Sequence, residues 1–286
     1  MRIFFLGDIF GKGGRKVVHY LLPRVIDQEA VDLTIANVEN ASKGIGVSRE
    51  AIKEMKAMGV QVMTSGNHVW RKPGVEMALQ EEPYFLRPAN YPSNTPGKGS
   101  IIWKSHLGIK VGVVNLLGRI FMEPLDCPFQ VGEMHIDQLL REEVKIIIVD
   151  FHAEATSEKG ALAWFLDGKV SAVLGTHTHI QTADERVLPK GTAFITDVGM
   201  TGAQDSVIGV KVDSSIRRFL TGIPQRLDPS SKNLMIHGVL LDICEETGKV
   251  IHFDVDSLDF LKNKIPGSIS SFQIEVKGRC KECLKR

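Results

Sequence analysis

The sequence predicts an α/β fold around a largely parallel sheet that also has an antiparallel part. Short apolar runs alternate with helical patterns through the first two-thirds of the 286 residues, and this alternation is typical of βαβ units. From Gly99 the pattern changes, because SIIWKSHLGIKVGVVNLLG (100–118) reads as two strands joined near Leu107 and Gly108. Strands joined by a short turn pair antiparallel, so we expect a mixed sheet.

Each predicted element rests on an apolar run or on apolar residues at helical spacing. Besides the hairpin, strands are expected at 2–8, 31–37, 60–66, 145–153 and 170–179. Helices are expected at 16–30, 49–58, 74–82, 135–144 and 158–166. After Asp184 strands return in 189–198 and in 238–256, the latter turning at Thr247 and Gly248. The segment 205–233 breaks the pattern with Gly, Pro and Ser, and it predicts either a lid over a site or an ordinary long connection.

Composition excludes several classes of protein. The formal net charge is +1, so we expect no stable binding to duplex nucleic acid and no attraction to anionic lipid. No run approaches the roughly 20 apolar residues of a membrane span, which predicts a cytoplasmic protein. The four cysteines are too few and too scattered for a disulfide-stapled fold and are expected as free thiols, with zinc or redox chemistry as the alternative for the tail pair: Cys127, Cys244, Cys280 and Cys283.

Polar side chains stand directly after five of the apolar runs. They are Asp8, Glu39 with Asn40, Asn67 with His68, His152, and His177 with His179. In an open parallel sheet, ligand sites form beyond the carboxyl ends of the strands, so these side chains are expected to gather in one crevice. His177 and His179 are two residues apart, and a strand continuing through them would point both rings to one face. Taken singly, each residue could instead cap a helix or lie in an exposed turn.

The residue types in this set suit a pair of transition-metal ions. Carboxylates, amides and imidazoles without a thiolate make an oxygen and nitrogen shell fit for manganese, iron, zinc, cobalt or nickel. One tetrahedral ion needs fewer ligands than the set provides. Two ions about 3.5–4 Å apart that share a carboxylate would use them all, and such pairs stabilise both oxygens of a phosphoryl displacement.

The glycine-rich stretch GDIFGKGGRK (7–16) lacks the sharper phosphate-binding motifs. It has neither the GK[ST] ending of a P-loop nor the GxGxxG spacing of a dinucleotide fold. We therefore expect these glycines to let the backbone turn tightly beside Asp8.

The ordered motifs resemble the calcineurin-like metallophosphoesterases, whose blocks run D-x-H, GD-x-x-D, GNH, H and GHxH. The resemblance is closer to their bacterial YmdB-like branch, through GDIFGKGGR, ANVENASKG, TSGNHVW, LRPANYP, DFHAEATSEK, GTHTHIQTAD and TDVGMTG. It implies a four-layer αββα sandwich with two mixed sheets. A single domain over 1–262 is expected, followed by a tail, 263–286, to which the resemblance assigns no role.

The resemblance also implies a ligand set, carried over residue by residue. One ion would take Asp8, Glu39, Asn40 and His179, and the other would take Glu39, Asn67, His152 and His177. Compared with the wider superfamily, Phe10 stands where D-x-H has its histidine, and Glu39 replaces the bridging aspartate. Asn40 is the expected substitute ligand, as in the YmdB-like branch.

The implied function is a binuclear phosphodiesterase for 3′,5′- or 2′,3′-cyclic nucleotides, using two divalent or mixed-valence ions, iron or manganese first. Metal-bound hydroxide would attack phosphorus, and His68, left without a metal, would act on the phosphate or the leaving oxygen as the catalytic residue. The alternatives are a broad phosphomonoesterase and a nucleotide-sensing regulator with weak turnover. Arg87, Asn90 and Tyr91 are expected either to contact substrate or to form a packed turn. Homo-oligomerisation is left open.

Overall fold

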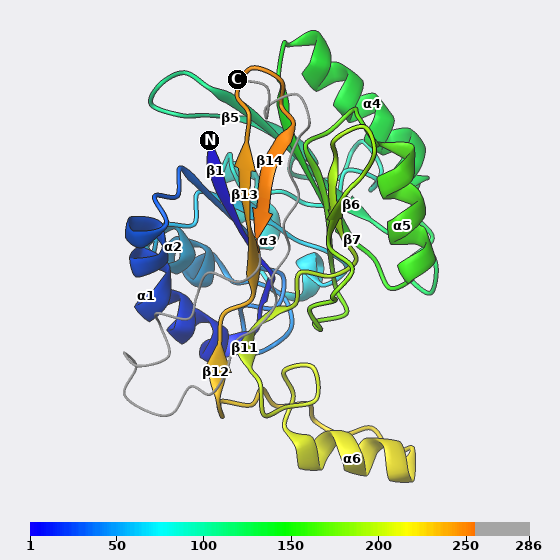
Figure 1. Ribbon diagram of the computed structural model, residues 1–286. Helices are drawn as coiled ribbons and strands as arrows, with labels where there is room; N and C mark the ends of the chain where they lie inside the picture. The colour runs from blue at the N-terminus through cyan, green and yellow to red at the C-terminus, as the bar shows by residue number, and fades with distance from the viewer. Residues whose placement is uncertain (255–286) are drawn as a thin grey trace.

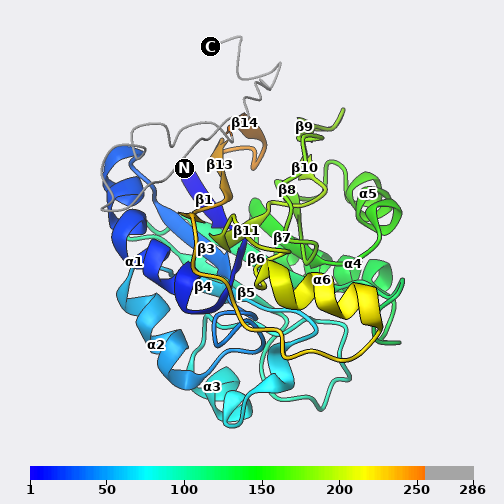
Figure 2. The ribbon, with the colours of Figure 1, turned by 90° about the horizontal axis from the view of Figure 1, so that it is seen from below.

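The computed structural model describes residues 1–254. Two β-sheets face each other, and helices cover their outer faces, so that the layers run helix, sheet, sheet, helix (Figures 1 and 2). The αββα sandwich with two mixed sheets is thereby confirmed. A third, smaller sheet that was not predicted joins β2 (Asp8–Ile9), β11 (Met200–Ala203) and β12 (Leu234–Met235).

The first large sheet has the strand order β14-β13-β1-β3-β4. Its strands are β1 (Arg2–Leu6), β3 (Leu33–Asn37), β4 (Val62–Thr64), β13 (Gly238–Ile243) and β14 (Val250–Asp254). The outer face is covered by α1 (Gly11–Gln28), α2 (Arg49–Ala57) and α3 (Val75–Glu81). β1, β3 and β4 run parallel, whereas β13 is antiparallel to β1.

The second large sheet has the strand order β5-β6-β7-β8-β10-β9. Its strands are β5 (Ser100–Lys104), β6 (Lys110–Leu117), β7 (Ile146–His152), β8 (Ala172–Thr176), β9 (Arg186–Val187) and β10 (Ala193–Ile195). The helices α4 (Pro128–Arg141) and α5 (Thr156–Phe165) cover its outer face. β5 and β6 form the predicted antiparallel hairpin, and β6, β7, β8 and β10 run parallel.

Strand periodicity explains how the sheets pack. In β7, Ile146 and Ile148 point into the core between the sheets, whereas Ile147 and Val149 pack against the helix layer. Because side chains alternate along a strand, the next residue of the inner row is Asp150, and His152 follows it. In β3, β4 and β8 the side chains that face the other sheet also end in a polar residue at the same edge, namely Asn37, Thr64 and Thr176. The space between the sheets is therefore apolar along most of its length and polar at the carboxyl edge.

Two local predictions were wrong. β8 ends at Thr176, so His177 and His179 do not share a strand face; instead both adopt the left-handed backbone region, with φ of 101° and 66°. α1 begins at Gly11, within the stretch expected as a loop. The tight turn beside Asp8 does occur, at Gly11 with φ +60°, but Gly14 lies inside the helix, where a Cβ atom would be 2.3 Å from the Thr201 carbonyl oxygen.

The segment 205–233 combines features of both predicted alternatives. It contains α6 (Val212–Thr221), which projects from the body of the molecule and has Ser215 as its one buried residue (Figure 1). The chain before this helix nevertheless reaches the predicted site, because the carbonyl of Ile208 contacts the His179 ring.

Several predictions concern residues outside the described range. The domain boundary at 262, the tail 263–286 and the Cys280 and Cys283 pair all lie beyond residue 254. Within the described range, Cys127 is a free thiol. None of the helices between residues 1 and 254 is long and apolar enough to cross a membrane.

Candidate metal centre

The carboxyl ends of parallel strands from both sheets deliver the predicted site residues to one place. Asp8 follows β1 within β2, Glu39 and Asn40 follow β3, and Asn67 and His68 follow β4. From the opposite sheet, His152 is the last residue of β7, and His177 and His179 follow β8. The structure brings all of these side chains together by a chain of contacts with no interruption.

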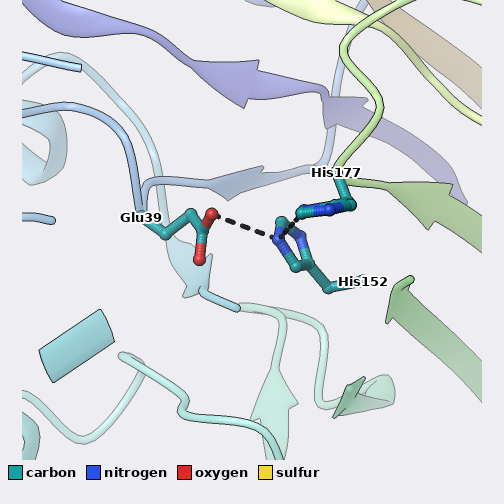
Figure 3. A group of neighbouring side chains, drawn as sticks. All are labelled: Glu39, His152 and His177. Atoms are coloured by element: carbon teal, nitrogen blue, oxygen red, sulfur yellow. Dashed lines mark hydrogen bonds and ion pairs between the residues drawn. The ribbon is translucent and has the colours of Figure 1, made fainter. Parts of the chain in front are cut away.

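The candidate metal ligands form two groups, here called the donor groups because their atoms could donate lone pairs to a metal. The first donor group is centred on His152. Its Nε2 atom lies 3.1 Å from Glu39 Oε1, 3.2 Å from Asn67 Oδ1 and 3.1 Å from His177 Nδ1. Glu39, His152 and His177 point toward one another across the gap between the sheets (Figure 3). Their ligand atoms all lie within 4.8 Å of one another, so the three residues form a group that can hold a metal ion.

The second group is centred on the amide nitrogen of Asn40. This Nδ2 atom lies 3.3 Å from Asp8 Oδ1, 3.2 Å from Glu39 Oε1 and 3.2 Å from His179 Nε2. Glu39 therefore contacts both groups through the same carboxylate oxygen. Asp8 also accepts a hydrogen bond from the backbone N–H of His177, 3.1 Å away, which ties the two groups together a second time.

Both groups contain more acceptor atoms than hydrogen atoms to share among them. An imidazole nitrogen has at most one hydrogen and an amide nitrogen has two, yet each faces three acceptors or lone-pair nitrogens. Lone pairs that converge in this way repel one another unless a positive charge lies between them. A cation satisfies all of them at once, so the residues present fit a metal site.

The remaining ring nitrogens fix the orientation of the histidines. His179 directs Nδ1 to the carbonyl oxygen of Ile208, 2.9 Å away, which leaves Nε2 for the site. His177 directs Nε2 to Glu154 Oε2, 3.0 Å away, which leaves Nδ1. Phe10, at the superfamily histidine position, packs edge-to-face on the His179 ring with centroids 5.4 Å apart. Phe10 thus supports a neighbouring ring.

The pKa shifts show how strongly the site favours positive charge. Burial alone would lower the pKa of His152, but the facing carboxylates, Glu39 first, outweigh burial and raise it to about 9. Burial would raise the pKa of Glu39, yet His152 and His68 hold it well below its ordinary value. Burial, together with the charge of His152, lowers the pKa of His177 to about 3, so this ring is neutral at pH 7. A metal cation at this point would take the place of the proton on His152.

His68 occupies a different position from the other histidines. Its backbone N–H donates to Glu39 Oε2 at 2.8 Å, and its Nδ1 atom lies 2.8 Å from Asn40 Oδ1. The side chain is 27% exposed, whereas that of His152 is fully buried. Its other ring nitrogen has no hydrogen-bond partner within residues 1–254, so the ring borders both donor groups and keeps one nitrogen for a bound molecule.

The LRPANYP segment forms a packed turn in the structure. The guanidinium of Arg87 donates to the backbone carbonyls of Pro88, Ala89, Thr95 and Pro96. Asn90 is fully buried and hydrogen-bonds to backbone groups of Leu117 and Asp126. These two side chains are fully used by the fold, which favours the structural alternative for them.

The sequence interpretation did not include several residues that shape the site. Glu154 orients His177, and the buried Asp197 accepts both the backbone N–H and the hydroxyl of Thr178, at 3.0 and 2.7 Å. Asp197 also pairs with the buried Lys159 at 3.0 Å. One signal for such residues was available, because Asp150 is a carboxylate in the otherwise apolar run IIIVDF, two residues before His152. The contacts of Asp197 had no comparable sequence signal.

Comparison with known proteins agrees with this architecture. The chain is 43% identical over 257 residues to a Bacillus subtilis protein named 2′,3′-cyclic-nucleotide 2′-phosphodiesterase, a match that covers 89% of this chain and 96% of the relative. A hypothetical protein from Thermus thermophilus has a similar structure, with a TM-score of 0.82 and 43% identity over 88% of this chain and 97% of that one. A phosphatase from Mycoplasma pneumoniae gives a TM-score of 0.84 and 33% identity over 100% of this chain and 96% of that one.

The family itself follows from one further match. The family model described as YmdB-like protein matches residues 4–255, which includes β1 from Phe4 onward, all later strands and helices of the described residues, and every side chain of the candidate metal centre. This chain therefore belongs to the YmdB-like family.

Proposed function

We propose that this protein hydrolyses 2′,3′-cyclic nucleotides at a binuclear metal centre. Membership of the YmdB-like family makes the chain a metal-dependent phosphoesterase. The single observation that carries the binuclear part is the position of Glu39, whose Oε1 atom lies 3.1 Å from His152 Nε2 and 3.2 Å from Asn40 Nδ2. One carboxylate that faces two separate donor groups is the arrangement that two neighbouring ions require.

The two donor groups divide the ligands between the ions. One ion would be held by Glu39, Asn67, His152 and His177, and the other by Asp8, Glu39, Asn40 and His179. Asn40 would bind through its amide oxygen, because an amide nitrogen has no lone pair for a metal. Metal binding would therefore rotate this amide, whose oxygen faces His68 and whose nitrogen faces Asp8, Glu39 and His179 in the structure. Nitrogen and oxygen ligands of this kind suit manganese, iron or zinc.

The bound ions would polarise the phosphate and activate water, and the side chains around them would complete the chemistry. Hydrolysis of a 2′,3′-cyclic phosphate at its 2′ bond breaks the bond between phosphorus and O2′, and the departing oxygen must take up a proton. His68 is the candidate donor, because one of its ring nitrogens is unpaired among the described residues while the other is held by Asn40. Glu39 keeps the ring in place through the backbone N–H of His68.

The substrate class rests on the Bacillus relative, whose name specifies 2′,3′-cyclic nucleotides and the 2′ bond. Nearly the whole of both chains is covered by that match. The Mycoplasma relative is named a phosphatase, so a monoesterase activity at the same centre is the second candidate. Relative rates on cyclic diesters and on simple monoesters separate the two.

One experiment tests the metal centre and the substrate class together. Purified protein is analysed for bound metal and then assayed on 2′,3′-cyclic AMP, 3′,5′-cyclic AMP and p-nitrophenyl phosphate, before and after treatment with a chelator. We expect two ions per chain, fastest turnover of the 2′,3′-cyclic substrate, and loss of activity on chelation that Mn²⁺ restores. One ion per chain in fully active protein would contradict the binuclear centre, and preference for the monoester would favour the second candidate.

A further inference from the structure

Asp150 is a buried carboxylate that joins the two sheets directly behind the candidate metal centre. It is 0% exposed, and each of its hydrogen bonds comes from a different strand. Thr176 in β8 donates to Oδ1 at 2.7 Å, and Asn37 in β3 donates to Oδ2 at 3.1 Å. Thr64 in β4 donates to the same Oδ2 atom. Asp150 thus receives donors from both sheets at the edge where the ligands gather.

The hydrogen bond from Thr176 determines which nitrogen of His152 carries a proton. A hydroxyl group has one hydrogen, and Thr176 gives it to Asp150, which as a carboxylate can only accept. Toward His152 Nδ1, 2.8 Å away, the same hydroxyl oxygen can therefore only accept. Asn37 Nδ2 also approaches this Nδ1 atom, at 3.3 Å, but Thr176 is the nearer partner. The acceptor oxygen of Thr176 favours the proton of the neutral ring on Nδ1, so that Nε2, which faces Glu39 and Asn67, keeps the lone pair that a metal ligand needs.

The hydrogen bond from Asn37 fixes the ligand on the opposite sheet. Its amide nitrogen donates to Asp150, so its oxygen faces the other way and accepts the backbone N–H of Glu39 at 3.2 Å. Rotating the amide would place oxygen against carboxylate and nitrogen against N–H, so only the observed orientation satisfies both partners. Through Asn37, Asp150 thereby orients the backbone of Glu39, whose carboxylate contacts both donor groups.

We propose that Asp150 is a positioning residue for metal binding, acting through Thr176 on His152 and through Asn37 on Glu39. This inference rests on the proposed function, because it concerns the same metal centre. Outer partners that fix a metal-binding histidine typically account for 10- to 100-fold in metal affinity. A buried polar cluster that only joined the two sheets would change stability and leave metal affinity unaltered.

The test measures affinity of the full-length protein for Co²⁺ by competition with a chelator, with no nucleotide present. Thr176→Val keeps the shape of the side chain and removes the hydroxyl, so we expect affinity for Co²⁺ to fall 10- to 100-fold. Thr176→Ser retains the hydroxyl and should restore wild-type affinity. Asp150→Asn should weaken binding as Thr176→Val does, and if Asp150→Asn does not fold, Thr176→Val and Thr176→Ser still decide the question.

Thr192, directly before β10 of the same sheet, supplies a matched control. It is also fully buried, and its hydroxyl donates to Val170 at 2.7 Å and accepts from the Gly168 N–H at 2.9 Å, at the opposite edge of the strands. Thr192→Val should lower stability and leave Co²⁺ affinity unchanged. Wild-type affinity in folded Thr176→Val, or an equal loss in Thr192→Val, would overturn the positioning role. A wild-type protein that bound no Co²⁺ would overturn the proposed function and this role together.

Discussion

The two sheets contribute to the proposed metal centre in different ways. The first sheet supplies Glu39 and Asn40 on loops without positive φ at either residue, directly beyond the end of β3. The second sheet supplies His177 and His179, both with positive φ, which costs about 1–3 kcal/mol for a residue other than glycine. Rigid surroundings must maintain that conformation. The part of the centre formed by Glu39 and Asn40, here called the acidic side, therefore depends on the end of a strand. The part formed by His177 and His179, here called the imidazole side, depends on a strained loop and on the groups that hold it.

Glu39→Gln should have the largest effect, because it removes the charge that both donor groups share. We expect both ions to be lost and hydrolysis to fall by more than about 100-fold, since changes to outer partners alone reach that size. Elemental analysis and steady-state rates measure the two effects. Two retained ions in this variant would show that the acidic side does not hold the centre together.

His68→Ala should keep both ions and lower the rate by about 10²- to 10⁴-fold, the usual contribution of a general acid. The defect should be large for a ribose leaving group and small for nitrophenolate, which needs little protonation. His177→Ala, made in parallel, should lose metal. If His68→Ala lost metal to the same extent, His68 would belong among the ligands of the acidic side.

Lys159→Met tests the support of the strained loop. The ammonium of Lys159 is 1% exposed and faces Asp197, which holds Thr178 between the two histidines. Removing one partner leaves an unpaired buried charge, so we expect the free energy of unfolding to fall by about 3–5 kcal/mol in urea titrations. Lys169→Met removes a half-exposed pair with Glu133 and should cost at most about 1 kcal/mol. If Lys159→Met and Lys169→Met lowered the free energy of unfolding equally, Asp197 would not depend on Lys159 as a buried partner.

Glu154→Gln should have the smallest effect. Glu154 is 48% exposed, and its contact with His177 Nε2 is open to solvent, so the pair contributes about 0–1 kcal/mol. We expect metal to be retained and the rate on 2′,3′-cyclic AMP to fall by no more than about fivefold. Glu39→Gln is the comparison variant. If Glu154→Gln lowered metal content and rate as much as Glu39→Gln does, the distinction between the two sides of the centre would be wrong.

Much of this arrangement could be predicted from the sequence, for a physical reason. Polar residues directly after apolar runs mark strand ends, and parallel strands bring their carboxyl ends to one edge. This reasoning placed Asp8, Glu39 and His152 correctly in space. The resemblance to a known family then supplied the two-sheet sandwich, which alternation alone had left as one mixed sheet.

The backbone at the histidines could not be predicted in the same way. Alternation along a strand suggested that His177 and His179 share a face, but the strand ends at Thr176. Both rings still reach the site because of a positive φ at each residue, and no local pattern signals such a conformation outside glycine. Hydrogen bonds between distant segments, such as Asp197 to Thr178, hold it in place, and these exist only in the folded chain.

The origin of the ligands in two opposing sheets links metal binding to the folding equilibrium. A cation can contact all of its ligands only when the sheets are docked, so it binds the native state in preference to the unfolded chain. Free metal at 100 times its dissociation constant then adds about 2.7 kcal/mol to the stability of the native state. Thermal unfolding should accordingly shift upward with metal concentration. If the proposed ligands hold metal in this way, metal supply sets the resistance to unfolding as well as the capacity for chemistry.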